Sequence, residues 1–384
     1  MRRIILYVLF LVIPAFCFGQ ATREAAIHSE VLNQDRKLWI NVPQYYDLRQ
    51  DSFQIVFVLD GNNRSLFEYA AASKRFLERN AVDLSEFNAP ESIIVGIEQK
   101  ERWTDFADNA GSDKFFRFLT DEVFPFVRKN YRTQNYTILI GHSLAGRFAL
   151  DALLRRPDLF NAVIAASPAY GKKNIDEIKS KIDALAKSGL ANDRALYVST
   201  TYLKNDGTEQ QFREFAEALN LQFKDASYRN FRFRFGSSET LGHAKSPYFS
   251  IPEGLHFIYA PSLWQIDVRS LFDKNSSAVL AADNYRQRIK ERFGVSISMR
   301  RYAPILIDEL VKANKTADAI RFLTGEVNQN PTDLDLFANL LTLLKKNKLA
   351  DYNSYKARFI KTMKQINTPE NEQAEWLKQI DKDG

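Results

Sequence analysis

Between residues 25 and 265 the sequence alternates short runs of β-forming residues with longer amphipathic segments. The β-type runs, among them FQIVFV, SIIVGI, YTILIG and RALYVSTT, are apolar along most of their length, as is typical of strands covered on both faces. The segments between them carry apolar residues at three- and four-residue spacing, which predicts helices. The pattern therefore predicts an α/β fold with a mainly parallel sheet, helices on both faces and a ligand site beyond the carboxyl ends of the strands.

The pattern changes near residue 275, after which β-type runs stop and helical segments follow in pairs. Residues 303–331 fit a helical hairpin of the tetratricopeptide type, with Leu306 and Leu310 on the first helix and Ala319 and Leu323 on the second. Pro331 marks the break, and the segment after it is a weaker second copy. An ordinary helical tail packed on the first domain fits the same pattern.

The first residues are typical of a secretory signal peptide. A basic MRR precedes the apolar run IILYVLFLVIPAFCF, and small residues in CFGQA offer a cleavage site. The run is too short and too early for a membrane span, although an uncleaved anchor helix is the alternative. We therefore expect an exported protein, periplasmic or secreted, with no stable membrane span after cleavage. Its parts would be a signal peptide (1–20), an α/β domain (21–272) and a helical domain (273–384).

Composition argues against several function classes. The net charge is +6, and acidic and basic residues alternate without a basic block, so we expect no nucleic-acid binding. Cys17 is the only cysteine and lies in the predicted signal peptide, so the mature chain would contain no disulfide and no reactive thiolate. No His or carboxylate cluster has metal-ligand spacing, and no glycine-rich phosphate loop follows a strand. We expect neither a metal nor a cofactor.

The segment YTILIGHSLAGRFAL, residues 136–150, places Ser143 between a strand and a helix. A serine at such a tight turn is held in a strained backbone conformation that exposes its hydroxyl. Residues two before and two after it face each other, and Gly141 and Ala145 are small enough to do so, although Gly is more usual at the second position. The sequence predicts that Ser143 is a nucleophile and that the N–H of Leu144 donates to an oxyanion.

A serine hydroxyl needs a base, and only one of the four histidines lies where this fold places a base. His243 lies in the polar loop after the last β-type run, where this order of elements delivers a base. His28 precedes the predicted sheet, His142 lies inside the turn with a packing and hydrogen-bonding role, and His256 lies in an apolar helical run as a partly buried residue. We therefore predict His243 as the general base.

The remaining groups come from two loops. The loop YLKNDGTEQ after RALYVSTT should carry the acid, and Asp206 in its Asn-Asp-Gly turn is favoured over Glu209. A Ser–His pair without a placed acid is the third alternative. The loop after VFVLD begins with Gly61, which allows a close turn, and the N–H of Asn62 is the predicted second oxyanion donor.

These segments together resemble a known family. LDGNN, IIVGIEQKERWTDF, ILIGHSLAGRFAL and GHAKSP, in this order, look like the esterase family of α/β-hydrolases that includes enterochelin-type siderophore esterases and esterase D. The resemblance covers roughly residues 25 to 265 and implies a metal-free serine hydrolase acting on carboxylic esters. It carries over Ser143 and His243, and Asp206 less directly because the acid loop varies. Arg102 in KERWTDF matches a recurrent arginine, whose role is either structural or substrate-facing.

The leading hypothesis is a carboxylic ester hydrolase with a small-molecule ester as its partner. Acyl transfer is the nearest alternative, because an alcohol can replace water in the second half of the reaction. A catalytically silent hydrolase fold is the other, in which the C-terminal helices would bind protein partners. The sequence does not select among siderophore, feruloyl, acetyl-sugar and short acyl esters.

Overall fold

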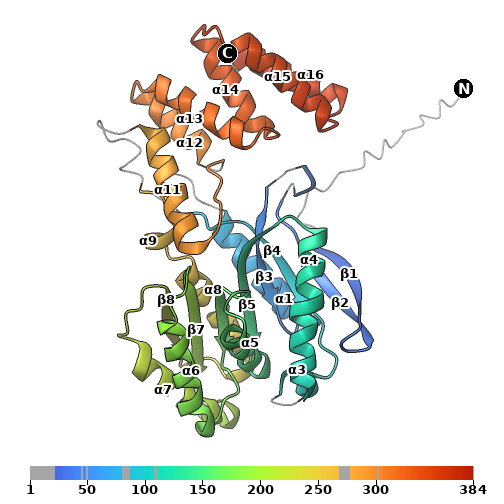
Figure 1. Ribbon diagram of the computed structural model, residues 1–384, viewed down its shortest axis with the longest axis vertical. Coiled ribbons are helices and arrows are strands. Elements are labelled where there is room, and N and C mark those ends of the chain that lie inside the picture. Colours follow the sequence, from blue (N-terminus) through green and yellow to red (C-terminus); the bar gives the residue numbers. More distant parts are fainter. Residues whose placement is uncertain are drawn as a thin grey trace, which may run out of the picture.

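A computed structural model describes residues 22–44, 46–48, 51–79, 87–107, 110–267, 277–300 and 302–383. The predicted signal peptide, residues 1–20, lies outside them. Eight strands form one sheet in the order β1-β2-β4-β3-β5-β6-β7-β8 (Figure 1). The strands are β1 (Thr22–Ser29), β2 (Gln34–Asn41), β3 (Phe53–Val58), β4 (Ser92–Ile97), β5 (Thr133–His142), β6 (Ala162–Ala166), β7 (Arg194–Thr201) and β8 (Phe231–Ser238).

The sheet is mainly parallel, as predicted. Strands β3 to β8 pair in parallel, whereas β1 pairs antiparallel with β2 and β2 with β4. One detail of the prediction is wrong, because His28 lies within β1 and not before the sheet. Strand β1 forms an edge, and its residues alternate between exposed and half-buried. It therefore lacks the continuous apolar run that identifies the central strands.

Two apolar clusters form the core, one on each face of the sheet, because successive strand residues point to opposite faces. Val56 and Val58 belong to one cluster, and Ile55 and Phe57 to the other. The first face is covered by α1 (Arg64–Glu78), α8 (Pro247–Ile258) and α9 (Pro261–Trp264). The second is covered by α2 (Arg102–Phe106), α3 (Ala110–Arg117), α4 (Phe124–Asn130), α5 (Leu144–Arg155), α6 (Ile175–Lys187) and α7 (Gly207–Phe223).

Short helical turns complete the α/β part. A π-helical turn, η2 (Phe118–Val123), joins α3 to α4. The 3-10 turns are η1 (Tyr46–Leu48), η3 (Lys172–Asn174) and η4 (His243–Lys245). Among the described residues, no helix is both long and apolar enough to cross a membrane.

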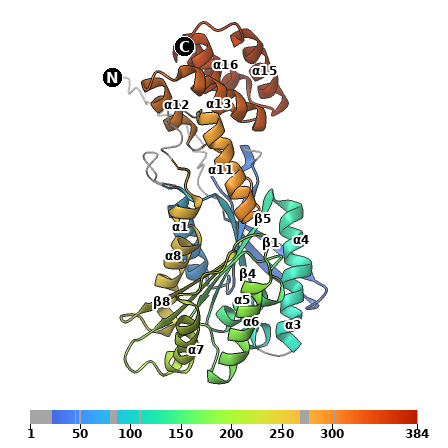
Figure 2. The ribbon, with the colours of Figure 1, turned by 60° about the vertical axis from the view of Figure 1, so that its left-hand side comes forward.

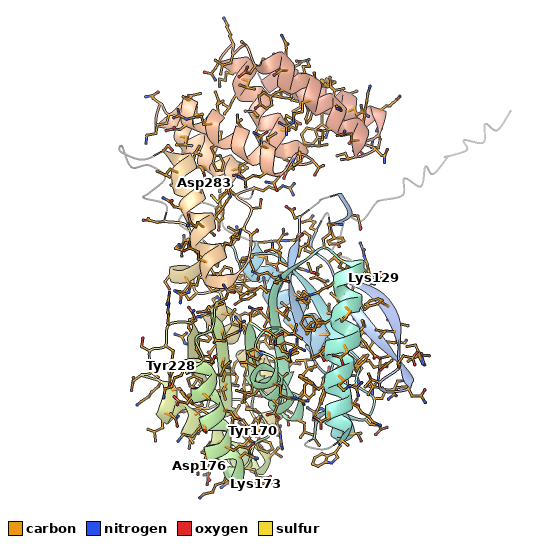
Figure 3. All side chains as sticks on the ribbon, in the orientation of Figure 1. Lys129, Tyr170, Lys173, Asp176, Tyr228 and Asp283 are labelled. Atoms are coloured by element: carbon orange, nitrogen blue, oxygen red, sulfur yellow. The ribbon has the colours of Figure 1, made fainter. Side chains whose placement is uncertain are left out.

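The C-terminal segment is helical, as expected, and lies at one end of the sheet (Figures 1 and 2). Its helices are α11 (Ala278–Phe293), α12 (Ala303–Lys312), α13 (Thr316–Gln329), α14 (Leu334–Lys346), α15 (Tyr352–Gln365) and α16 (Glu370–Asp383). In Figure 3, Asp283 on α11 lies at the end of the molecule opposite to Tyr170, Lys173 and Asp176, which follow the carboxyl end of β6. The helical segment therefore occupies the edge formed by the amino ends of the parallel strands.

Helix α11 attaches this segment to the sheet. The ring of Phe293 stacks on Trp264 with centroids 3.7 Å apart, and the hydroxyl of Tyr285 donates to the Trp264 carbonyl at 2.7 Å. The N–H of Asp193, the residue before β7, donates to the Arg292 carbonyl at 2.7 Å. The first apolar cluster consequently runs without a break from the sheet to Ile380 on α16.

The residues predicted for the helical hairpin lie where expected. Leu306 and Leu310 are buried on α12, and Ala319 and Leu323 are buried on α13. Pro331 lies in the connection to α14. The spacing of apolar residues in this part of the sequence therefore correctly predicts helices that are buried along one face.

The stack of Phe293 on Trp264 predicts a large stability effect. Both side chains are fully buried, so Phe293→Ala should leave a cavity and lower the free energy of unfolding by about 3–5 kcal/mol. Denaturant unfolding of the full chain measures this change. Leu221→Ala, at a side chain 77% exposed on α7, is the control and should change the same quantity by less than about 0.5 kcal/mol. Equal effects of the two substitutions would contradict this account of the docking.

Candidate active site

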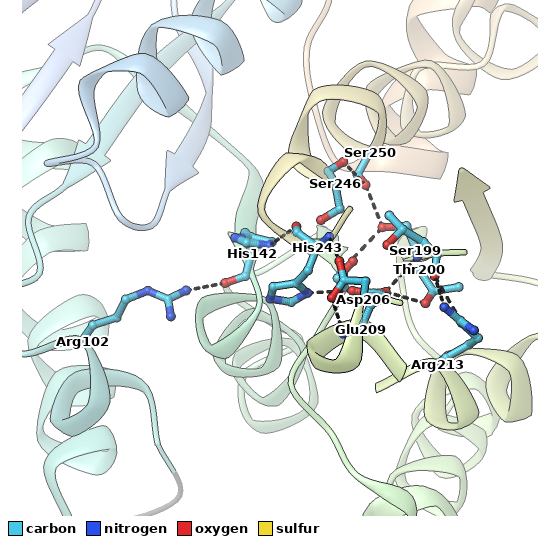
Figure 4. Close-up of polar contacts among 12 residues, drawn as sticks. Arg102, His142, Ser199, Thr200, Asp206, Glu209, Arg213, His243, Ser246 and Ser250 are labelled. Atoms are coloured by element: carbon cyan, nitrogen blue, oxygen red, sulfur yellow. Dashed lines mark hydrogen bonds and ion pairs between the residues drawn. The ribbon is translucent and has the colours of Figure 1, made fainter. Parts of the chain in front are cut away.

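Segments far apart in the sequence meet at the carboxyl ends of the parallel strands. The register pairs Val58 of β3 with Ile140 of β5, so the loop after β3 and the turn after β5 begin at the same level. Thr201 of β7 pairs with Ser238 of β8, which brings the loops after these two strands together as well. Figure 4 shows the polar contacts that link Arg102 and His142 with residues of the segments after β7 and β8.

Ser143 lies in the strained turn that its sequence predicts. Its φ of 59° and ψ of −119° place a non-glycine residue in a rarely populated region. Neighbouring backbone holds it there, because its N–H donates to the Ala166 carbonyl at 2.9 Å and its carbonyl accepts from the Ala169 N–H at 3.0 Å. A Cβ at Gly141 would lie 2.1 Å from the Ala145 carbonyl oxygen, which explains why glycine is needed there.

His243 begins the short turn η4 and is held at three of its polar groups. Its Nδ1 lies 2.6 Å from Oε2 of Glu209, and its N–H donates to Oδ2 of Asp206 at 2.6 Å. Its carbonyl accepts from Nε2 of His142 at 2.9 Å and from the Ser246 N–H at 3.1 Å (Figure 4). Among the described residues, none forms a hydrogen bond to Nε2 of His243.

The contacts of the imidazole correct the preferred acid. Glu209, and not Asp206, contacts the ring of His243. Asp206 is the N-cap of α7, so its carboxylate points at backbone N–H groups: Oδ1 accepts from the Glu209 N–H at 3.1 Å. The turn-forming Asn-Asp-Gly sequence indicated this helix start rather than the acid, and the carboxylate that reaches the ring comes from the first turn of the helix.

Glu209 is fully buried and accepts hydrogen bonds from two residues of β7. Its Oε1 accepts hydrogen bonds from the Thr200 hydroxyl and from the Thr201 N–H. Burial alone would raise the pKa of Glu209, but the hydrogen bonds that it accepts outweigh burial and hold this pKa below its usual value. An ionised carboxylate fixes the proton of the imidazole on Nδ1 and leaves Nε2 as the acceptor. Thr200 and Thr201 were not predicted as part of the site, because the sequence marks them only as the end of a buried strand.

Among the backbone N–H groups at this edge that have no acceptor in the described part of the chain are those of Leu144 and Asn62. Leu144 is the first residue of α5, so its N–H has no partner within the helix. In the loop after β3, Gly61 and Asn63 donate to the carbonyls of Ile97 and Asp60, whereas the N–H of Asn62 has no acceptor among the described residues. These are the two donors that the sequence predicted.

Arg102 connects these two segments. Its guanidinium contacts both carboxylate oxygens of Asp60, at 3.0 and 3.2 Å, and donates to the His142 carbonyl at 2.8 Å. The side chain is about one third exposed. These three hydrogen bonds support a structural role for Arg102. The exposed part of its side chain is also compatible with contact to a substrate.

The other histidines lie away from this arrangement or support it. His28 pairs with Asp35 across the first hairpin, and His256 is exposed on α8 rather than partly buried as predicted. His142 has the hydrogen-bonding role that we expected, since a carbonyl only accepts and Nε2 must therefore carry the proton. Among the described residues, no group of three or more His, Cys, Asp or Glu side chains could hold a metal ion.

His142 predicts a loss of stability in mild acid. Burial, together with the nearby His243 and Arg102, lowers the pKa of His142 from 6.5 to about 3. Below pH 6.5 the unfolded chain binds a proton that the folded chain does not, so stability should fall by about 2 kcal/mol between pH 7.5 and pH 5 from this group alone. Urea unfolding of His142→Gln should lack that contribution. His256→Gln is the control, and an unchanged pH dependence in His142→Gln would contradict the prediction.

Comparison with known proteins agrees with this architecture. A family model described as "Putative esterase" matches residues 29–292. The ferri-bacillibactin esterase BesA of Bacillus subtilis is 28% identical over 136 residues, which cover 29% of this chain and 47% of that protein. This chain therefore aligns with about half the length of that relative.

Solved structures share the fold at low identity. An IroE-like serine hydrolase from Shewanella oneidensis has a TM-score of 0.65 at 19% identity, with 80% of this chain and 99% of that chain covered. An uncharacterised protein from Capnocytophaga ochracea has a TM-score of 0.59 at 17% identity, with 91% and 94% covered, so its match reaches into the C-terminal helices. The chain has an α/β-hydrolase fold with a C-terminal helical segment, and it belongs to the family described as "Putative esterase".

Proposed function

We propose that this protein is a serine hydrolase that cleaves carboxylic esters through an acyl-enzyme on Ser143. The observation that carries the proposal is the imidazole of His243, held by the buried carboxylate of Glu209 at the same sheet edge as the strained turn of Ser143. His142 joins the two, because it precedes Ser143 and donates to the His243 carbonyl. Membership of the esterase family supports the same chemistry.

In the proposed reaction, the same residues act first in the acylation of Ser143 and then in the hydrolysis of the acyl-enzyme. Ser143 Oγ attacks the ester carbonyl while His243 Nε2 takes its proton, and Glu209 stabilises the imidazolium that forms. The N–H groups of Leu144 and Asn62 donate to the oxyanion. The tetrahedral intermediate collapses as His243 returns the proton to the leaving alcohol, and water then repeats the sequence on the acyl-enzyme. Glu209 replaces Asp206 in this assignment.

Arg102 would set the distance between the two oxyanion donors. It binds Asp60, two residues before Asn62, and the carbonyl of His142, two residues before Leu144. Donors must be in place before charge develops if they are to stabilise it without reorganisation. A single side chain that ties both loops supplies that arrangement.

Within carboxylic esters, we propose a siderophore ester as the substrate class. The name of the Bacillus relative, a ferri-bacillibactin esterase, supports it. Trp103, which follows Arg102 on α2, is 71% exposed and offers an aromatic surface next to the residue that contacts the turn. A panel of siderophore, feruloyl, acetyl-sugar and short acyl esters tests this proposal, and added acceptor alcohol separates hydrolysis from acyl transfer.

We also propose that residues 273–384 form a domain of tetratricopeptide-like hairpins, continuous in its core with the α/β part, that binds a protein partner. Asn314 after α12 and Lys348 after α14 both have positive φ and lie 34 positions apart, which is the period of that repeat. The next N–H after each donates to a carbonyl five residues back, from Lys315 to Leu310 and from Leu349 to Leu344. Export to the periplasm or medium stays a prediction from the first 20 residues.

The nucleophile is tested directly by Ser143→Ala. We expect kcat for ester hydrolysis to fall by about 10³-fold or more, because residual catalysis would come only from binding and the oxyanion donors. A fluorophosphonate probe should label the wild-type protein at Ser143 and leave the variant unlabelled. Ser188→Ala, at an exposed serine after α6, is the control and should hydrolyse and label normally. Folded wild-type protein that neither hydrolyses nor labels would favour a silent scaffold.

The acid is tested by Glu209→Gln. The amide keeps the shape but not the charge, so we expect kcat to fall roughly 10²- to 10⁴-fold with KM little changed. Glu217→Gln lies on the same helix with an exposed side chain and should keep wild-type kinetics. Wild-type kcat in Glu209→Gln would show that the reaction, if any, runs without this carboxylate.

A further inference from the structure

We propose that Asp206 is a positioning residue whose carboxylate fixes the main chain of His243 relative to Glu209. This inference rests on the proposed function, in which His243 is the general base. Two carboxylates would then act on one histidine: Glu209 on its ring and Asp206 on its backbone. The contact on the backbone is as short as the contact on the ring, 2.6 Å in each case.

The carboxylate of Asp206 joins the two segments that carry the acid and the base. Its Oδ1 accepts from the N–H of Glu209 at 3.1 Å, and its Oδ2 accepts from the N–H of His243 at 2.6 Å (Figure 4). One planar group therefore holds the first turn of α7 at a set distance from the start of η4. Hydrogen bonds from the backbone of His243 and Glu209 lower the pKa of Asp206, so the charge that strengthens both bonds is present at neutral pH.

His142 binds the same stretch of backbone at the carbonyl of His243. Asp206 binds the N–H of His243, and Nε2 of His142 donates to its carbonyl at 2.9 Å. We call this pair of contacts the main-chain clamp. Among the described residues, the ring of His243 has a hydrogen-bond partner only at Nδ1, and its contacts with the rings of His142 and Phe212 are not hydrogen bonds. Rotation of the loop backbone would therefore move Nε2 even while the contact with Glu209 persists. The clamp restrains that motion, which the ring contact alone does not.

Gly242 shows that the close approach is built into the chain. A Cβ at this residue would lie 3.0 Å from Oδ2 of Asp206 and 3.1 Å from the side chain of Leu203. Its backbone, with φ −89° and ψ 174°, is one that any residue adopts. Space, and not backbone conformation, therefore favours glycine before His243, and the space is needed for the carboxylate of Asp206.

The discriminating variant is Asp206→Ser. Serine is a good N-cap, so the bond to the Glu209 N–H can persist, but a single short hydroxyl cannot also reach the His243 N–H. We expect kcat to fall about 10- to 100-fold, as for an ångström-scale displacement of a catalytic group, with KM within about twofold of wild type. Asp333→Ser makes the same change at the N-cap of α14, far from the site, and should leave kcat unchanged.

A proton resonance gives a readout that does not depend on turnover. The proton between Nδ1 of His243 and Glu209 should give a strongly downfield signal, identified by its loss in Glu209→Gln. Asp206→Ser should shift or broaden this signal, whereas Asp333→Ser should not. A merely structural role of Asp206 would lower the melting temperature of Asp206→Ser and leave the signal in place, as we expect for Asp333→Ser, which breaks the ion pair with Arg300.

A second pair of variants tests the same contact without touching a carboxylate. Gly242→Ala should push the Asp206 carboxylate aside and lower kcat in the same direction as Asp206→Ser, by a smaller factor. Gly171→Ala is its matched control, because Gly171 precedes the turn η3 with almost the same backbone, φ −91° and ψ 174°. A Cβ at Gly171 would meet no described atom within 4 Å, so Gly171→Ala should keep wild-type kinetics.

The outcomes separate this inference from the proposed function. Wild-type kcat and an unmoved resonance in Asp206→Ser would overturn the clamp while labelling of Ser143 still supports the hydrolase. A wild-type protein that neither hydrolyses nor labels would overturn the function, and the resonance would still decide whether Asp206 positions His243. If Asp206→Ser does not fold, Gly242→Ala against Gly171→Ala decides the question.

Discussion

The hydrogen bond from the Ser143 N–H to the Ala166 carbonyl is the contact on which the site depends. It belongs to the last pair of the parallel β5–β6 ladder, His142 with Ala166, directly before the chain turns into α5. A positive φ at a serine is unfavourable by itself, and it persists because neighbouring strands leave the turn no alternative. The sheet therefore fixes the backbone of Ser143, the proposed nucleophile, and the loops after β7 and β8 carry the proposed acid and base.

The two carboxylates near His243 have hydrogen-bond donors that keep them charged in spite of burial. A buried carboxylate without donors would take up a proton. Glu209 avoids this with donors from Thr200, Thr201 and the imidazole. Asp206 differs from Glu209 because it is half-buried and accepts hydrogen bonds from two backbone N–H groups. Glu209 thus contacts the ring of His243, and Asp206 contacts its backbone. Neither carboxylate is placed to make the contact of the other.

Much of the architecture could be predicted because continuous apolar runs and tight glycine turns are each compatible with few local structures. RALYVSTT coincides with β7, and Ser143 occupies the expected strained turn. The acid could not be ranked in this way. Asp206 and Glu209 lie three residues apart, and which one meets the imidazole depends on where α7 begins and on the direction of its first turn. Strand β1 was missed as part of the sheet around His28 because edge strands lack a fully apolar run.

The helical segment is fastened by α11 to the amino ends of the strands, through Trp264 and Asp193, while Ser143 and His243 lie beyond the carboxyl ends. Immobilising the molecule through its last helices would therefore leave the reactive edge facing the medium. The same geometry makes the C-terminus the suitable place for an affinity handle or a fluorophore. A partner bound by the proposed hairpins and an ester cleaved at the proposed site would therefore not compete for space.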